Sequence, residues 1–202
     1  MDYTNPTPSD IFFSPAVNAV QAARGSRESY ARMAARGAFR TEINDDLTEQ
    51  LAAADSFYLA TASADGQPYI QHRGGPPGFI RVLDDHRIAF ADYRGNKQYI
   101  STGNLSENHR AQMFVMDYAN QRRVKIWGQA ITTQDAAIMS QLMPDGYRAQ
   151  PEQAIIFTVN VWDLNCPQHI PIKLPISDVA PLIADLRAQV AALEAELAAA
   201  RR

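Results

Sequence analysis

The hydrophobic and polar positions divide the chain into three zones with different periodicities. From about residue 15 to residue 54 the apolar residues recur at helical spacing. Ser14 and Pro15 mark a helix start, because Ser caps free N–H groups and Pro tolerates the first helical position. A further helix is predicted over residues 46–54. We therefore expect an N-terminal helical extension over residues 1–54.

The middle zone, from Ser56 to about Trp162, alternates short apolar runs with turn signals, which is typical of antiparallel strands. Asp65-Gly66 predicts a hairpin turn, because this dipeptide accommodates positive φ. The expected strands cover residues 57–62, 68–73, 79–83, 87–92, 111–117, 124–132 and 155–162, and short helices are expected over 97–103 and 134–143. Strands of this number and spacing favour a barrel or a sandwich.

The third zone, residues 176–202, predicts one long helix. Its apolar residues alternate at intervals of four and three: Val179, Ile183, Leu186, Val190, Leu193, Leu197 and Ala200. That is the a/d spacing of a coiled coil over about three heptads. Pro181 is expected in the first turn, where it costs no hydrogen bond. Two interpretations stay open: the helix packs on its own domain, or it pairs with another subunit.

Composition excludes several classes of protein. The 202 residues include 19 Lys and Arg against 22 Asp and Glu, a net charge of -3 that argues against a basic nucleic-acid-binding surface. A single cysteine, Cys166, forms no internal disulfide and fits a reducing compartment. Together with His169 it supplies two ligands, too few for a zinc site, so no metal is expected. No apolar run is long enough to span a membrane, and the N-terminus lacks signal-peptide features, so we expect a cytoplasmic protein.

The first cluster of candidate binding residues closes the second predicted strand and reads Gln71, His72, Arg73, Gly74 and Gly75. Its three polar side chains offer hydrogen-bond donors of different reach, and the glycines let a flat ligand or a phosphate approach the backbone. The alternative interpretation is a core histidine beside a solvated arginine.

The second cluster follows a later strand and reads Asp92, Tyr93, Arg94, Gly95, Asn96, Lys97 and Gln98. A Gly-Asn turn before a helix directs backbone N–H groups outward, and a helix N-terminus favours an anion. Arg94 and Lys97 add full positive charges. The pattern indicates a phosphate cradle, and the alternative is an ordinary solvated turn.

The third cluster lies on the strand expected over residues 124–132 and just before it. Alternation places Arg123, Lys125 and Trp127 on one face. Two cations beside an indole can hold a flat anionic ligand, whereas the alternative is a half-exposed strand with basic residues outward.

Taken in order, these motifs resemble the pyridoxamine 5'-phosphate oxidase-like, FMN-binding split-barrel proteins. The resemblance covers about residues 55–133 and rests on Arg122-Arg-Val-Lys-Ile-Trp-Gly together with three stretches that resemble a bacterial flavin-nucleotide-binding subgroup: Ile70-Gln-His-Arg-Gly-Gly-Pro-Pro-Gly-Phe, Phe90-Ala-Asp-Tyr-Arg-Gly-Asn-Lys and Gly103-Asn-Leu. It implies a mainly β fold with flanking helices, a six-stranded antiparallel split β-barrel over residues 55–170. The helices would occupy residues 1–54 and 176–202. It also implies a homodimer with two FMN molecules at the subunit interface.

The resemblance also assigns residues to the cofactor. Gln71, His72, Arg73 and Gly74 would line the isoalloxazine and ribityl chain, with Asp92 and Tyr93 on the neighbouring strand. Asn96, Lys97 and Gln98 would hold the phosphate together with Arg73. Arg123 and Lys125 would reach across from the partner subunit, and Trp162, Asn165 and Cys166 would close the site.

The implied activity is that of an FMN-dependent oxidoreductase, which transfers hydride between a small molecule and flavin N5. His72 is the one general acid or base suggested within the clusters. The chain ends in Asn165-Cys-Pro-Gln-His and a helix, not in the Trp- and Arg-bearing segment of the true oxidase, so a different substrate is expected. The alternatives are a protein that holds FMN, haem or a deazaflavin without turnover, and a structural protein that uses its barrel and helix only to dimerise.

Overall fold

The computed structural model describes residues 8–164 and 167–201, which form two units. Of the described residues, the first unit contains 8–116 and 123–164, and the second contains 117–122 and 167–201.

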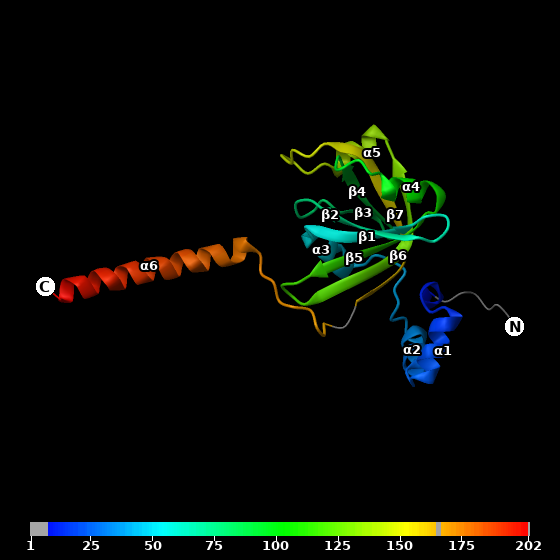
Figure 1. Ribbon diagram of the computed structural model, residues 1–202, viewed down its shortest axis with the longest axis horizontal. Coiled ribbons are helices and arrows are strands. Elements are labelled where there is room, and N and C mark those ends of the chain that lie inside the picture. Colours follow the sequence, from blue (N-terminus) through cyan, green and yellow to red (C-terminus); the bar gives the residue numbers. More distant parts are fainter. Residues whose placement is uncertain (1–7, 165–166, 202) are drawn as a thin grey trace. The chain divides into compact units, whose positions relative to one another are not determined.

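Short helices precede the sheet in the first unit: η1 (Pro8–Ile11), α1 (Pro15–Ala23), α2 (Arg27–Ala35) and α3 (Asp45–Ala53). The three α-helices lie within the zone of residues 15–54 that the apolar spacing predicted to be helical, whereas η1 precedes that zone (Figure 1). The Ser14 hydroxyl accepts a hydrogen bond from the Val17 amide at 3.3 Å, so Ser14 caps α1 as expected. Leu47 and Leu51 of α3 are fully buried, and their burial anchors this helix to the core.

Seven strands of the described residues form one sheet, in the order β2-β1-β5-β6-β7-β4-β3. They are β1 (Ser56–Ala62), β2 (Pro68–Gly74), β3 (Arg81–Asp84), β4 (Arg87–Tyr93), β5 (Arg110–Asp117), β6 (Arg122–Thr133) and β7 (Pro151–Leu164). The mainly β, antiparallel fold with flanking helices is confirmed. The expected six-stranded barrel is wrong in two respects, since β3 adds a seventh strand through its hairpin with β4, and β2 and β3 end the order as unpaired edges.

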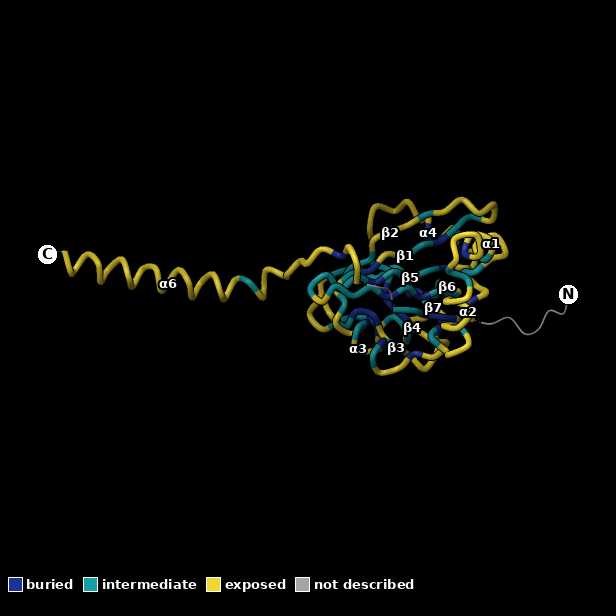
Figure 2. Tube along the Cα trace, turned by 90° about the horizontal axis from the view of Figure 1, so that it is seen from below, coloured by how far each residue is buried: buried dark blue, intermediate teal, exposed yellow. Residues whose placement is uncertain are grey.

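The core lies within this sheet, and the buried segments gather along its strands (Figure 2). Burial alternates along β1 and β5, whereas four consecutive residues of β4 are buried. Phe57 of β1 meets Phe90 of β4 edge to face, with ring centroids 4.9 Å apart. The long strands β6 and β7 shift register at Trp127 and Gly128. A Cβ atom on Gly128 would lie 1.9 Å from the carbonyl oxygen of Thr158, so only glycine fits this close strand contact.

Two short helices lie between strands, α4 (Ile100–Glu107) and α5 (Ala136–Leu142). α4 starts three residues later than predicted. The backbone at Lys97 and Tyr99 is left-handed, with φ of 60° and 52°, and a right-handed helix cannot include such residues. The turn that precedes α4 is consequently longer than the sequence indicated.

The second unit contains the long helix α6 (Ile176–Ala200), as the heptad spacing predicted. Pro181 is its sixth residue and lies inside the helix, so the expectation that it belongs to the first turn was wrong. Elsewhere in this unit the Gln121 amide donates to the Ile170 carbonyl at 2.7 Å. Within the described residues, no helix is both long enough and apolar enough to cross a membrane.

Candidate functional site

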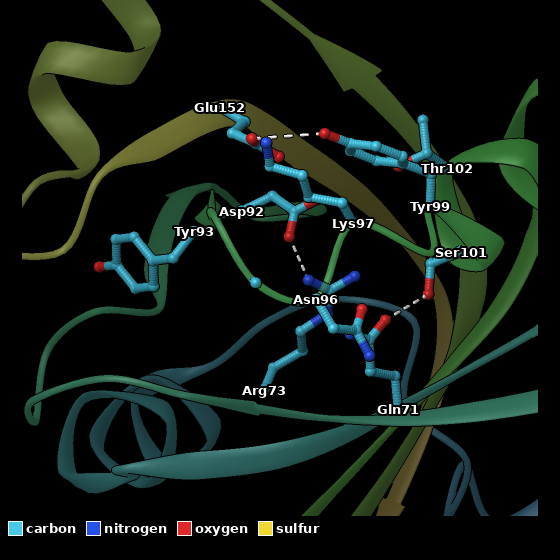
Figure 3. Close-up of a pocket in the computed structure, with 11 residues that line it drawn as sticks. Gln71, Arg73, Asp92, Tyr93, Asn96, Lys97, Tyr99, Ser101, Thr102 and Glu152 are labelled. Atoms are coloured by element: carbon cyan, nitrogen blue, oxygen red, sulfur yellow. Dashed lines mark hydrogen bonds and ion pairs between the residues drawn. The ribbon is translucent and has the colours of Figure 1, made fainter.

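A polar pocket of about 330 Å³ lies in the first unit, where β2, β4, β7 and the turn before α4 converge (Figure 3). This volume includes space that is open to solvent. The lining residues are Gln71, Arg73, Asp92, Tyr93, Gly95, Asn96, Lys97, Tyr99, Ser101, Thr102 and Glu152.

The inner wall of the pocket is a buried ion pair between Arg73 of β2 and Asp92 of β4, whose side chains are 11% and 12% exposed. The Gln153 amide donates to the second Asp92 oxygen at 2.9 Å and to the Thr102 hydroxyl at 2.8 Å. Asp92 and Gln153 are direct cross-strand partners, so the sheet register itself holds this network together. The Arg73 Nε atom is buried and has no partner among the described residues.

The outer wall is the turn that carries Asn96 and Lys97. The Asn96 side chain accepts a hydrogen bond from the Gln98 amide at 3.2 Å. Left-handed backbone at a residue other than glycine costs about 1 kcal/mol or more, and such residues gather at ligand clamps and active sites. The turn contains two of them, Lys97 and Tyr99.

Charges around the pocket are largely paired. Arg94 turns toward β7, with 3.2 Å from its guanidinium to the Gln150 amide oxygen and 3.9 Å to the Glu152 carboxylate. Arg73 is neutralised by Asp92. Lys97 is exposed and forms no ion pair with any residue that the structure describes. Lys97 therefore brings to the pocket rim a positive charge that no described residue compensates.

The start of α4 supplies hydroxyl and amide groups to the pocket. The Ser101 hydroxyl, in a buried residue, donates to the Gln71 side-chain oxygen at 2.9 Å. Tyr99 precedes the helix and provides no side-chain cap. The positive end of the helix dipole is therefore available to an anion.

Six of the eleven residues predicted to bind the cofactor line the pocket: Gln71, Arg73, Asp92, Tyr93, Asn96 and Lys97. Five do not: His72, Gly74, Gln98, Arg123 and Lys125. Sequence reasoning included Gly95 in the second cluster without assigning it to the cofactor, and it missed Tyr99, Ser101, Thr102 and Glu152 as lining residues. A detectable signal existed for Ser101 and Thr102, since these two hydroxyl residues lie in the first turn of α4, just after the turn that carries Lys97.

His72 faces away from the pocket. Along β2, Gln71 and Arg73 are half-buried on one side, whereas His72 is exposed on the other, next to the ring of Tyr58. The alternative interpretation of a core histidine beside a solvated arginine is therefore wrong for both residues. The strand alternation buries the arginine and exposes the histidine.

The third cluster lies on β6, with the predicted alternation. Val124 and Ile126 are buried, while Arg123, Lys125 and Trp127 share the opposite face. Trp127 stacks on Phe12 with ring centroids 4.5 Å apart, so a side chain of the same unit already occupies one face of the indole.

Lys125 lies opposite Asp163 of β7. Burial lowers the pKa of the Lys125 ammonium and raises the pKa of the Asp163 carboxyl. Both groups therefore give up hydration in the fold, a cost that their mutual attraction offsets only partly.

The structure gives no support to the expectation that Trp162, Asn165 and Cys166 close the site. Trp162 is a core residue, 1% exposed, and its indole N–H donates to the Glu42 carbonyl at 2.8 Å. Asn165 and Cys166 lie outside the described residues.

Comparison with known proteins identifies the family. The family model for pyridoxamine 5'-phosphate oxidase matches residues 43–166, more than half of the chain. The chain therefore belongs to the pyridoxamine 5'-phosphate oxidase family, and the family resemblance stated from the motifs is confirmed. This match includes the sheet and every residue that lines the pocket.

Two solved structures, both of HupZ, agree with this fold. HupZ from Group A Streptococcus is 16% identical with a TM-score of 0.51, and the match covers 65% of this chain and 99% of that one. A variant of the same protein gives 17% identity and a TM-score of 0.50, covering 61% and 99%. An FMN-binding protein from Syntrophomonas wolfei is 12% identical with a TM-score of 0.46, covering 72% and 97%. No curated protein sequence matches the chain.

Proposed function

We propose that the chain is a flavoprotein that holds the phosphate of FMN in the pocket between β2, β4 and the start of α4. The observation that carries the proposal is the unpaired Lys97, held in left-handed backbone at the rim of a pocket lined with hydroxyl and amide groups. Family membership supports the same cofactor, because the residues that line the pocket all lie in the matched segment.

The residues fit a phosphate group in their chemistry. Lys97 would supply the charge, and Asn96 and Thr102 would supply side-chain hydrogen-bond donors. The uncapped start of α4 adds backbone N–H groups and a favourable dipole. The buried Arg73 Nε atom is a donor whose partner the described residues do not supply. The carboxylates of Asp92 and Glu152 are each near an arginine and oppose the anion less than free carboxylates would.

Bound FMN would supply hydride chemistry at its N5 atom. The chain's own contribution would be orientation. The Arg73–Asp92–Gln153–Thr102 network would fix the wall against which the cofactor lies, and the Ser101 bond to Gln71 would fix the adjoining strand. Networks of this kind keep a site in one geometry because every member is held by another.

We further propose a homodimer with the cofactor at the subunit interface, in which Arg123 and Lys125 serve the partner's site. Their position on β6, away from the pocket of their own chain, is compatible with that role. The substrate would be a small molecule other than pyridoxamine phosphate. Light scattering coupled to size-exclusion chromatography tests the dimer, since a 22 kDa particle would contradict a shared site.

The outward position of His72 favours a second candidate function, binding of FMN without turnover. None of the described residues that line the pocket is a histidine or a cysteine. Proton transfer would then depend on Tyr93, on the substrate or on solvent. Burial raises the pKa of the Tyr93 hydroxyl, and Tyr147 nearby adds to this, so Tyr93 is a weaker acid than usual.

A flavin titration tests the proposal. The purified full-length chain is titrated with FMN and, separately, with riboflavin, and binding is followed by the flavin absorbance bands and fluorescence. We expect FMN to bind with shifted bands and riboflavin to bind markedly more weakly, because riboflavin lacks the phosphate. Absence of FMN binding would refute the proposal. Addition of NADH or NADPH to the complex then separates the two functions, since bleaching of the flavin indicates an oxidoreductase.

A further inference from the structure

Helix α6 of the second unit is exposed along nearly its whole length (Figure 2), and its large apolar side chains form a stripe along one face. The helix has no buried residue over its 25 positions. Leu186 is 59% exposed and Leu193 is 64% exposed, and Ile183, Val190 and Leu197 are exposed in the same way. A row of large apolar side chains on one helix face marks a surface that a partner covers.

The apolar stripe is narrow. Its width distinguishes a helix that packs on a globular domain from a helix that pairs with another helix. A helix that packs on a globular domain needs apolar residues at a, d and one flanking position, whereas a coiled-coil seam needs only a and d. Along the last two heptads the flanking positions of α6 are polar or charged: Arg187, Gln189, Glu194 and Glu196. This pattern fits another helix and not the face of a sheet.

The residues within the stripe indicate the number of helices in a parallel coiled coil. The a positions are Ile176, Ile183, Val190 and Leu197, and the d positions are Val179, Leu186, Leu193 and Ala200. β-branched residues at a with leucine at d favour two parallel strands. We propose that α6 forms a parallel, in-register coiled coil with α6 of a second copy of this chain.

Charge complementarity supports the parallel direction. In a parallel pair, each g residue lies beside the e residue that follows five positions later on the other helix. Glu196 would then meet Arg201 of the second copy, which pairs opposite charges at the C-terminal end twice by symmetry. Gln189 would meet Glu194, a pair without repulsion.

A disulfide-trapping experiment on the full chain tests both pairing and direction. All variants carry Cys166→Ser, which removes the natural thiol. Ala200→Cys places a thiol at a d position, and the matched control Ala195→Cys places one at an f position on the outer face of the same helix. Both replace an exposed alanine, so neither is expected to disturb folding. Each protein is oxidised at micromolar concentration, and covalent dimer is measured on non-reducing gels.

We expect the Ala200→Cys protein to form covalent dimer roughly a hundredfold faster than the Ala195→Cys protein, because paired thiols have a millimolar effective concentration. Leu186→Glu with Leu193→Glu should reduce the fast rate to the control rate, whereas Ala188→Glu on the outer face should not. Equal rates for the two cysteine positions would overturn the proposal. An antiparallel pair would also do so, because residue 200 of each copy would then lie near opposite ends of a helix about 37 Å long.

Discussion

Arg73 of β2 and Asp92 of β4 form a buried ion pair although four strands separate β2 from β4 in the order of the sheet. The contact requires the sheet to roll until its two ends approach each other. The side chains of Arg73 and Asp92 join the two ends of the sheet, between which the described backbone forms no strand pairing. The pocket lies at this junction, so the rolling of the sheet and the formation of the pocket depend on the same pair.

We expect Asp92→Ala to lower the free energy of unfolding by about 3–5 kcal/mol, because it leaves the buried Arg73 charge without a partner. The double variant Arg73→Met with Asp92→Leu removes both charges. Its loss of unfolding free energy should therefore be much smaller than the sum of the losses caused by Arg73→Met alone and by Asp92→Leu alone. Urea unfolding followed by circular dichroism measures each value. Additive effects would show that the two residues do not act as a pair.

Lys97→Ala tests the charge at the pocket rim. Loss of one charge-assisted hydrogen bond should weaken FMN binding by about 1.5–3 kcal/mol, while riboflavin binding should stay nearly unchanged because riboflavin has no phosphate. Flavin fluorescence titration gives both affinities. Lys173→Ala is the control, because it removes the same charge from a lysine of the second unit. Equal weakening of FMN and riboflavin would contradict the phosphate role.

The sequence predicted most of the fold because the two periodicities are strong in this chain. The helix that contains Leu47 and Leu51, the Asp65-Gly66 hairpin and the alternation of β6 all lie where the pattern placed them. The start of α4 was missed because left-handed backbone at Lys97 and Tyr99 has no sequence signal, as neither is glycine or asparagine.

How the site residues come together could not be predicted, for a different physical reason. Arg73 and Asp92 were both named from local motifs, yet the pairing between them depends on how far the sheet rolls, which strand patterns do not specify. Glu152 comes to the pocket only through the register of β7 against β4. Residues brought together by long-range pairing leave no mark in a local window of sequence.

Gly128→Ala tests the close contact between β6 and β7. The added Cβ atom would meet backbone at Thr158 and the ring of Phe157, so the strands must separate or the bulge must shift. We expect a loss of about 3 kcal/mol, at the upper end of the range for overpacking. Thermal and urea unfolding measure the loss. Gly103→Ala in α4 is the matched control, since a Cβ atom there meets nothing within 4 Å, and it should leave stability unchanged or raise it.

Asp84 in the β3–β4 hairpin gives a pH-dependent prediction. Its carboxylate accepts a hydrogen bond from the His86 amide at 2.9 Å and lies 2.6 Å from the Arg87 guanidinium, and these contacts lower the pKa of Asp84 below its ordinary value of 3.8. A lowered pKa in the fold means that the unfolded chain takes up the proton first as pH falls. The stabilisation is therefore fully present above the ordinary pKa and disappears as pH falls through the lowered value.

Asp84→Asn should consequently be less stable than the natural chain near neutral pH, and the difference should vanish in strong acid. Urea midpoints measured from about pH 2.5 to pH 7 test this, because the window spans the ordinary pKa of an aspartate. Asp85→Asn, which removes a neighbouring charge without touching these hydrogen bonds, controls for the change in net charge. A difference that stays constant across the whole range would mean that the Asp84 contacts are those of a neutral acceptor, and that its charge stabilises nothing in the hairpin.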